Sequence, residues 1–157
     1  MTDSTPFSDD DVRFMRLALQ EAERAAELDE VPVGAVIVAH GQVIARAHNL
    51  CEQLRDFTAH AEMQAFTSAS EYLGGKFLDK CTLYVTLEPC PMCAGAIAAA
   101  RIERLYYGAS DPKSGGVEQG ARVFAHPQCH HAPQVFDGIS EAPAAKLLRD
   151  FFAAKRL

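Results

Sequence analysis

The sequence lacks any run of about eighteen uninterrupted apolar residues, the length needed to span a membrane as a helix. Its N-terminus lacks the basic and then apolar pattern of a secretion signal, and no repeat or low-complexity tract is present. Positive charge is not in excess either, because the formal net charge at pH 7 is −6. We therefore expect a cytoplasmic protein with no membrane partner, and the composition argues against nucleic-acid binding.

The acidic imbalance is confined to the N-terminal part of the chain. Residues 1–30 hold nine acidic and three basic side chains, so the rest of the chain is electrically balanced. Residues 140–157 hold four basic and two acidic side chains. This basic tail either contacts phosphates or complements the dipole of a C-terminal helix, and composition alone favours the second interpretation.

The length of 157 residues and the hydrophobic content of 48% suit one core but not two. We expect a single domain over residues 1–157. Five cysteines are an odd number, which argues against a disulfide framework. Cys51, Cys81 and Cys129 are most simply free thiols in a reducing compartment.

The hydrophobic pattern alternates between strands and helices. Helical periodicity is present over residues 12–28, 60–72, 91–100 and 144–155, and strand-like runs cover residues 33–39, 43–48, 82–87, 104–107 and 134–136. Residues 110–133 look irregular, except for a short helix expected over 117–124. We predict an α/β fold: a three-layer α/β/α sandwich with a mixed sheet of about five strands.

Four residues form the pattern that carries the chemistry. His60 and Glu62 begin one predicted helix, and Cys90 and Cys93 begin another. Cysteines three apart project from one helix face, and the helix N-terminus favours thiolates. One imidazole and two thiolates supply three zinc ligands, whereas structural zinc sites usually have four. The sequence therefore predicts one catalytic Zn²⁺ per chain, with Glu62 free to take a proton from water.

Each half of this pattern also has a simpler interpretation. A Cys-x-x-Cys pair suits a redox pair, half of a structural zinc site or two buried thiols, and a lone His-x-Glu is usually capping and surface charge. Their conjunction matches the known signature of zinc deaminases, His-x-Glu followed by Pro-Cys-x-x-Cys. A second group, His126, Cys129, His130 and His131, is more typical of a surface cluster than of a metal site.

The segments around these motifs resemble the cytidine deaminase superfamily. The similar segments read VPVGAV at 31–36, TAHAEM at 58–63, LYVTLEPC at 83–90 and CAGA at 93–96. YVTLE at 84–88 and GASDPKSG at 108–115 are most similar to the bacterial tRNA-specific adenosine deaminases. The resemblance covers residues 12–156. It implies the deaminase fold, a homodimer, and conversion of adenosine to inosine at the wobble position of the tRNA anticodon stem-loop.

The resemblance further implies the residues that act on the substrate. Glu62 would shuttle protons and Asn49 would contact the base. The backbone N–H of Ala61 and the main chain near Glu88 and Pro89 would hold the base against the metal. Further positions implied are the pocket walls Val31, Leu87 and Ala109, the nucleotide neighbours Asp111 and Lys113, and the C-terminal RNA contacts Phe152, Lys155 and Arg156. From the residues alone, Asn49 suits a turn cap and Phe152 suits core packing.

Two other functions compete with this interpretation. A free-base deaminase, such as one for guanine, needs no basic surface and would tolerate the acidic chain. A zinc-stabilised binding module without turnover would make Glu62 incidental, but it would ordinarily recruit a fourth ligand.

Overall fold

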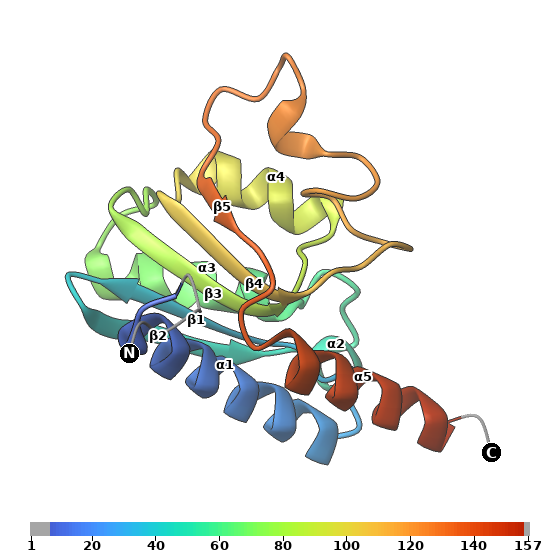
Figure 1. The fold of residues 1–157 in the computed structure, drawn as a ribbon. Helices are drawn as coiled ribbons and strands as arrows, with labels where there is room; N and C mark the ends of the chain where they lie inside the picture. The colour runs from blue at the N-terminus through green and yellow to red at the C-terminus, as the bar shows by residue number, and fades with distance from the viewer. Residues whose placement is uncertain (1–6, 156–157) are drawn as a thin grey trace, which may run out of the picture.

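The computed structural model describes residues 7–155 and contains a five-stranded mixed sheet (Figure 1). The strands are β1 (Gly34–Ala39), β2 (Gln42–His48), β3 (Cys81–Leu87), β4 (Arg104–Ala109) and β5 (Gln134–Phe136). Their order across the sheet is β2-β1-β3-β4-β5. Strand β1 is antiparallel to β2 and β3, whereas β3, β4 and β5 are parallel.

Helices cover both faces of the sheet, which confirms the predicted three layers. On one face, α1 (Asp9–Glu27) lies beside α5 (Glu141–Lys155), and on the other α3 (Ala61–Leu73) neighbours α4 (Pro91–Ala100) (Figure 1). The short helices α2 (Cys51–Leu54) and η1 (Val123–Ala125) lie in connections. Within residues 7–155, no helix has both the length and the apolar character required to cross a bilayer.

Alternating side chains of the central strands supply two separate cores. Leu83 and Val85 of β3 belong to the core under α3 and α4, whereas Tyr84 between them belongs to the core under α1. Successive strand residues point to opposite faces of the sheet. When both faces are buried, the sequence of a strand is therefore a continuous run of apolar residues. This explains why β3 shows no polar alternation in the sequence.

Most predicted elements agree with the structure to within a few residues, and the differences have local causes. Helix α1 begins three residues earlier than predicted, because Ser8 and Asp11 form a reciprocal capping box. Helix α2 was not predicted, since its four residues are too few to show periodicity. It is held by Glu30, whose carboxylate accepts hydrogen bonds from the backbone N–H groups of Glu52 and Gln53.

The predicted helix over residues 117–124 is wrong. Only Val123–Ala125 forms a helical turn, of the 3-10 type. The backbone N–H groups of Val117, Glu118 and Gln119 donate to the Glu88 carboxylate instead of forming helical hydrogen bonds. The chain also turns through positive φ angles at Gly120 and Arg122. A partner distant in sequence thus overrides the local pattern.

Gly34, at the start of β1, allows α1 to pack directly on the sheet. A Cβ atom at this position would lie 2.0 Å from the Ala18 carbonyl oxygen and 2.6 Å from the Ala22 nitrogen. Both are helix backbone atoms, so relief requires the helix to move. We expect Gly34→Ala to lower the free energy of unfolding by about 3 kcal/mol in urea denaturation at fixed zinc concentration.

Gly75→Ala is the matched control, because a Cβ atom there meets nothing within 4 Å. If both alanine variants unfold at the same urea concentration, α1 does not depend on close contact at Gly34.

Candidate metal centre and active site

Two helix N-termini converge to form the candidate metal centre. His60 is the N-cap residue of α3, and Cys90 is the N-cap residue of α4, with Pro91 at its first position. Cys93, one turn further along α4, is fully buried. His60 Nδ1 lies 3.6 Å from Cys90 Sγ and 3.5 Å from Cys93 Sγ. Within the described residues, this is the one His, Cys, Asp and Glu group with metal-ligand spacing.

The donor atoms fit a tetrahedral zinc ion. With zinc bonds of about 2.3 Å to sulfur and about 2.0 Å to nitrogen, two tetrahedral ligands lie about 3.5 Å apart. The separations from His60 to the two sulfurs match this value. Two soft thiolates and an imidazole also favour zinc over the harder cations. The residues therefore suit zinc in both chemistry and spacing.

The two cysteines shift each other's pKa in opposite directions. Contact with Cys93 and with His60 lowers the pKa of Cys90 to about 4, whereas contact with Cys90 raises the pKa of Cys93. The hydrogen bond to Cys90 likewise raises the pKa of His60. Cys90 is thus a thiolate at neutral pH, and a bound cation would displace the proton of Cys93.

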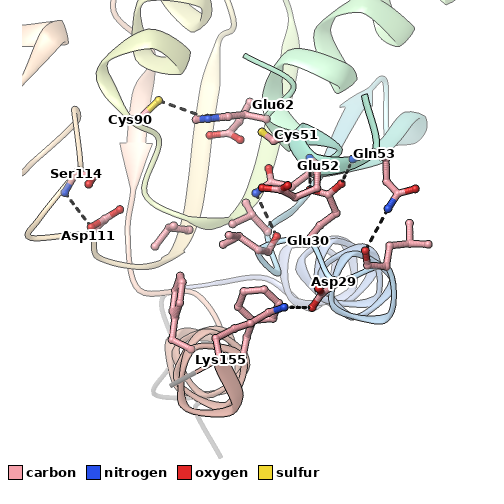
Figure 2. Close-up of a pocket in the computed structure, with 18 of the residues that line it drawn as sticks. Asp29, Glu30, Cys51, Glu52, Gln53, Glu62, Cys90, Asp111, Ser114 and Lys155 are labelled. Carbon is pink, nitrogen blue, oxygen red and sulfur yellow. Dashed lines mark hydrogen bonds and ion pairs between the residues drawn. The ribbon is translucent and has the colours of Figure 1, made fainter. Parts of the chain in front are cut away.

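Glu62 lies in the first turn of α3, next to the three donor atoms but outside their group. Its side chain faces the same pocket as Cys90 (Figure 2). It is only 4% exposed, and burial raises its pKa to about 7. A carboxyl group with such a pKa can both take and give a proton at neutral pH.

Asn49 links the pocket wall to the start of α3. Its side-chain oxygen accepts a hydrogen bond from the Ala61 N–H at 2.8 Å, and its amide nitrogen donates to the Val31 carbonyl at 3.1 Å. Asn49 Oδ1 therefore occupies the Ala61 N–H that was expected to hold the base. The second amide hydrogen of Asn49 is the group left for a ligand.

A cavity of about 730 Å³ opens in front of the metal centre. Most of the predicted substrate-binding residues line it, and Figure 2 shows Cys90 and Glu62 on one side with Lys155 of α5 opposite. The predicted residues that line this cavity are Val31, Asn49, His60, Glu62, Leu87, Cys90, Asp111, Phe152 and Lys155.

The remaining predicted residues do not line the cavity or lie outside the described chain. Ala61 acts through its backbone, Ala109 is buried at the end of β4, and Lys113 is exposed. Arg156 lies outside the described residues. Sequence reasoning missed the other lining residues, namely Leu28, Asp29, Glu30, Val33, Cys51, Glu52, Gln53, Ser114 and Phe151, and it considered only the main chain near Glu88, which also borders the cavity.

Helix α5 closes one side of the cavity through an ion pair. Lys155 Nζ lies 2.5 Å from Asp29 Oδ1, at the turn that follows α1 (Figure 2). Both side chains are largely exposed, so the pair contributes about 1 kcal/mol at most. A phosphate group near the cavity would compete with Asp29 for this lysine.

Glu88, between Leu87 and the metal-ligand turn, is a buried carboxylate surrounded by donors. Burial alone would raise its pKa, but hydrogen bonds from the backbone N–H groups of Asp111, Gln119, Glu118 and Val117 hold the pKa of Glu88 below its usual range. The side chain is therefore ionised at neutral pH.

The cluster of His126, Cys129, His130 and His131 shows no metal-ligand spacing within the described chain. Its members bond to nearby protein atoms instead. Cys129 Sγ donates to the His131 carbonyl, and His131 Nε2 lies 2.8 Å from the Ile102 carbonyl oxygen.

Comparison with known proteins identifies the family. The model of the MafB19-like deaminases matches residues 9–156. A protein of Agrobacterium fabrum named tRNA-specific adenosine deaminase is 58% identical over 144 residues, which cover 92% of this chain and 95% of that protein. The chain belongs to the tRNA-specific adenosine deaminases.

Comparison with solved structures also supports the assignment of this chain to the tRNA-specific adenosine deaminases. A structure from a study of A-to-I editing by tRNA:A34 deaminases at the wobble position is 57% identical. The aligned region covers 87% of this chain and 99% of the solved chain, with a TM-score of 0.86. A guanine deaminase of Nitrosomonas europaea, 22% identical with a TM-score of 0.78, covers 98% of this chain and 87% of its own, and shares the fold alone.

Proposed function

We propose that this protein hydrolyses adenosine to inosine at the wobble position of tRNA anticodons. The observation that carries the proposal is the arrangement of Glu62 beside three donor atoms that fit zinc, in a cavity of about 730 Å³. The family and its 58% identical relative support the tRNA substrate over a free base. The distance of the guanine deaminase, at 22% identity, argues against the free-base alternative.

His60, Cys90 and Cys93 would hold one zinc ion per chain. When bound, zinc supplies a Lewis acid that makes water a nucleophile near neutral pH. Glu62 takes one proton from the attacking water as its oxygen adds to C6 of the purine. It passes that proton to N1 and then assists transfer of a second proton to the departing amine. Adenosine and water thus become inosine and ammonia, and the carboxylate of Glu62 is regenerated.

The remaining cavity residues bind and orient the nucleotide. Asn49 offers an amide hydrogen to the purine, while Val31 and Leu87 supply apolar walls. An adenosine in a folded anticodon loop must be splayed out to reach Glu62. Phe152 of α5 is 42% exposed, so it presents a ring at the mouth on which a neighbouring base can stack.

A substrate panel tests the proposal. We expect the zinc-loaded protein to convert an anticodon stem-loop RNA with adenosine at the wobble position, detected as inosine by mass spectrometry of its nucleosides. Free adenine and free guanine should release no ammonia at the same enzyme concentration. Ammonia from guanine with unchanged RNA would overturn the tRNA assignment and select the free-base alternative.

Freeing Lys155 from its ion pair should strengthen RNA binding. In Asp29→Asn the lysine loses its ion-pair partner, and the cavity mouth loses one negative charge. We expect the dissociation constant for the stem-loop to fall about threefold at low salt, with a smaller effect at high salt. Fluorescence anisotropy of labelled RNA over a salt series measures both.

Asp150→Asn controls for charge alone, because Asp150 pairs with Lys146 on α5 and does not line this cavity. An equal gain in both variants would mean that Lys155 has no specific part in binding.

We extend the proposal to the assembly and location of the protein. A homodimer would cover the outward face of α4, where Gly95, Ala98 and Ala99 are partly or fully exposed. Small residues on a helix permit close approach of another surface. Sedimentation equilibrium should give twice the chain mass of 17.1 kDa. Because the proposed substrate is a tRNA, we also propose that the enzyme acts in the cytoplasm.

A further inference from the structure

The Glu88 carboxylate gathers five hydrogen-bond donors from one loop. Oε1 accepts from the Asp111 N–H at 2.9 Å and the Ser110 hydroxyl at 3.3 Å. Oε2 accepts from three successive N–H groups, those of Val117, Glu118 and Gln119, at 3.2, 2.9 and 2.9 Å. The loop from Ser110 to Gln119, which we call the mouth loop, is therefore folded around a single side chain that is 2% exposed.

The mouth loop also lies against the backbone on either side of Cys90. The Gly116 N–H donates to the Pro89 carbonyl at 2.8 Å, and a Cβ atom on Gly116 would come within 2.5 Å of the Pro91 nitrogen. The Glu88 N–H in turn donates to the Ala109 carbonyl at the end of β4. The turn that carries a metal-centre residue and the loop at the cavity mouth are thus joined through Glu88.

The outer edge of the same loop reaches the cavity. Asp111 and Ser114 both line it, and the Ser114 N–H donates to Asp111 Oδ1 at 3.0 Å (Figure 2). Lys113 between them is exposed. The position of these three side chains depends on the loop backbone, and the loop backbone depends on Glu88.

We propose that Glu88 is a positioning residue, which fixes the mouth loop and so sets the affinity of the enzyme for its RNA substrate without taking part in the proton transfers. The inference rests on the proposed function. Glu88 borders the cavity, but its carboxylate is saturated by donors of the mouth loop, so it acts on the substrate through Asp111, Lys113 and Ser114.

Two variants disturb the same contact in different ways. Glu88→Gln keeps the size of the side chain but removes its negative charge. The new NH₂ group would also face backbone N–H groups of the mouth loop, which are donors and cannot accept its hydrogens. Gly115→Ala leaves Glu88 intact, but its Cβ atom would lie 2.7 Å from the Glu88 carboxylate and 2.6 Å from the Asp111 carbonyl. Each variant should therefore loosen the mouth loop.

The matched controls change the same residue types elsewhere. Glu103→Gln alters a half-exposed carboxyl before β4, at the end of that strand opposite the mouth loop. Gly75→Ala adds a Cβ atom that meets nothing within 4 Å.

The test combines kinetics with hydrogen exchange on zinc-loaded proteins. For Glu88→Gln and Gly115→Ala, we expect the half-saturating concentration of the anticodon stem-loop RNA to rise at least about tenfold. The single-turnover rate at saturating RNA should stay within about threefold of the wild-type rate. Amide exchange over residues 110–119 should accelerate in both variants and in neither control.

Three outcomes would overturn the inference. Unchanged exchange over residues 110–119 in the two variants would show that the carboxylate does not hold the loop. If the rate at saturating RNA falls by the same factor as the half-saturating concentration rises, Glu88 takes part in the chemistry or supports the stability of the whole fold. Loss of zinc from Gly115→Ala would make the loop part of the metal centre. If the wild type fails to edit RNA, the exchange comparison still decides whether Glu88 holds the loop.

Discussion

Glu62→Gln is expected to lower the single-turnover rate of RNA deamination by about 1,000-fold or more, because the proposed mechanism assigns every proton transfer to this one carboxylate. Glutamine keeps the size of the side chain but cannot carry a proton between water and the purine. Zinc content should be unchanged, since Glu62 lies outside the group of three donor atoms. Metal analysis and rapid-quench kinetics on the same preparation separate the two effects.

Glu71→Gln is the control on the same helix, because Glu71 is an exposed residue near the other end of α3. It should keep the wild-type rate. If Glu62→Gln retained more than a tenth of that rate, the carboxyl of Glu62 would not be the proton shuttle, and the binding-module interpretation would gain support.

The second large effect concerns the metal. Cys90→Ala removes one of the three proposed zinc ligands, and we expect zinc affinity to fall at least about 100-fold. Deamination should fall in parallel. Competition with a chromophoric chelator gives the affinity, and metal analysis after dialysis gives the stoichiometry, which should be close to one zinc per wild-type chain.

Cys51→Ser controls for the loss of a thiol at the same cavity. Cys51 lines the cavity but does not belong to the group of donor atoms. It should bind zinc as the wild type does. Equal zinc loss in both variants would mean that the ligand set includes Cys51.

Much of the fold follows from local patterns. Helix α4 and strand β5 have the predicted bounds, because Pro91 marks the start of the helix and turn residues flank both elements. The spacing of His60, Cys90 and Cys93 sufficed to predict that two helix starts would meet. The helix and strand bounds depend on residues that are neighbours in sequence. The meeting of His60 with Cys90, thirty residues away, could be predicted because the side chains are of types that bind one metal ion together.

The parts that sequence reasoning missed depend on distant partners. Glu88 and Glu30 read as ordinary charged residues at the ends of elements, yet each is buried and folds a segment about twenty residues or more further along the chain. The predicted helix over 117–124 fails for the same reason. Lys155 reads as a helix-terminal charge, and its pairing with Asp29 depends on how α5 lies against α1.

The central claim is that one zinc ion has three protein ligands, with its fourth position left for water beside Glu62. X-ray absorption at the zinc edge of the loaded protein tests this most directly. We predict two sulfur ligands at about 2.3 Å and two nitrogen or oxygen ligands at about 2.0 Å, one of which exchanges with solvent. A third sulfur, or a shell closed entirely by protein atoms, would contradict the catalytic assignment.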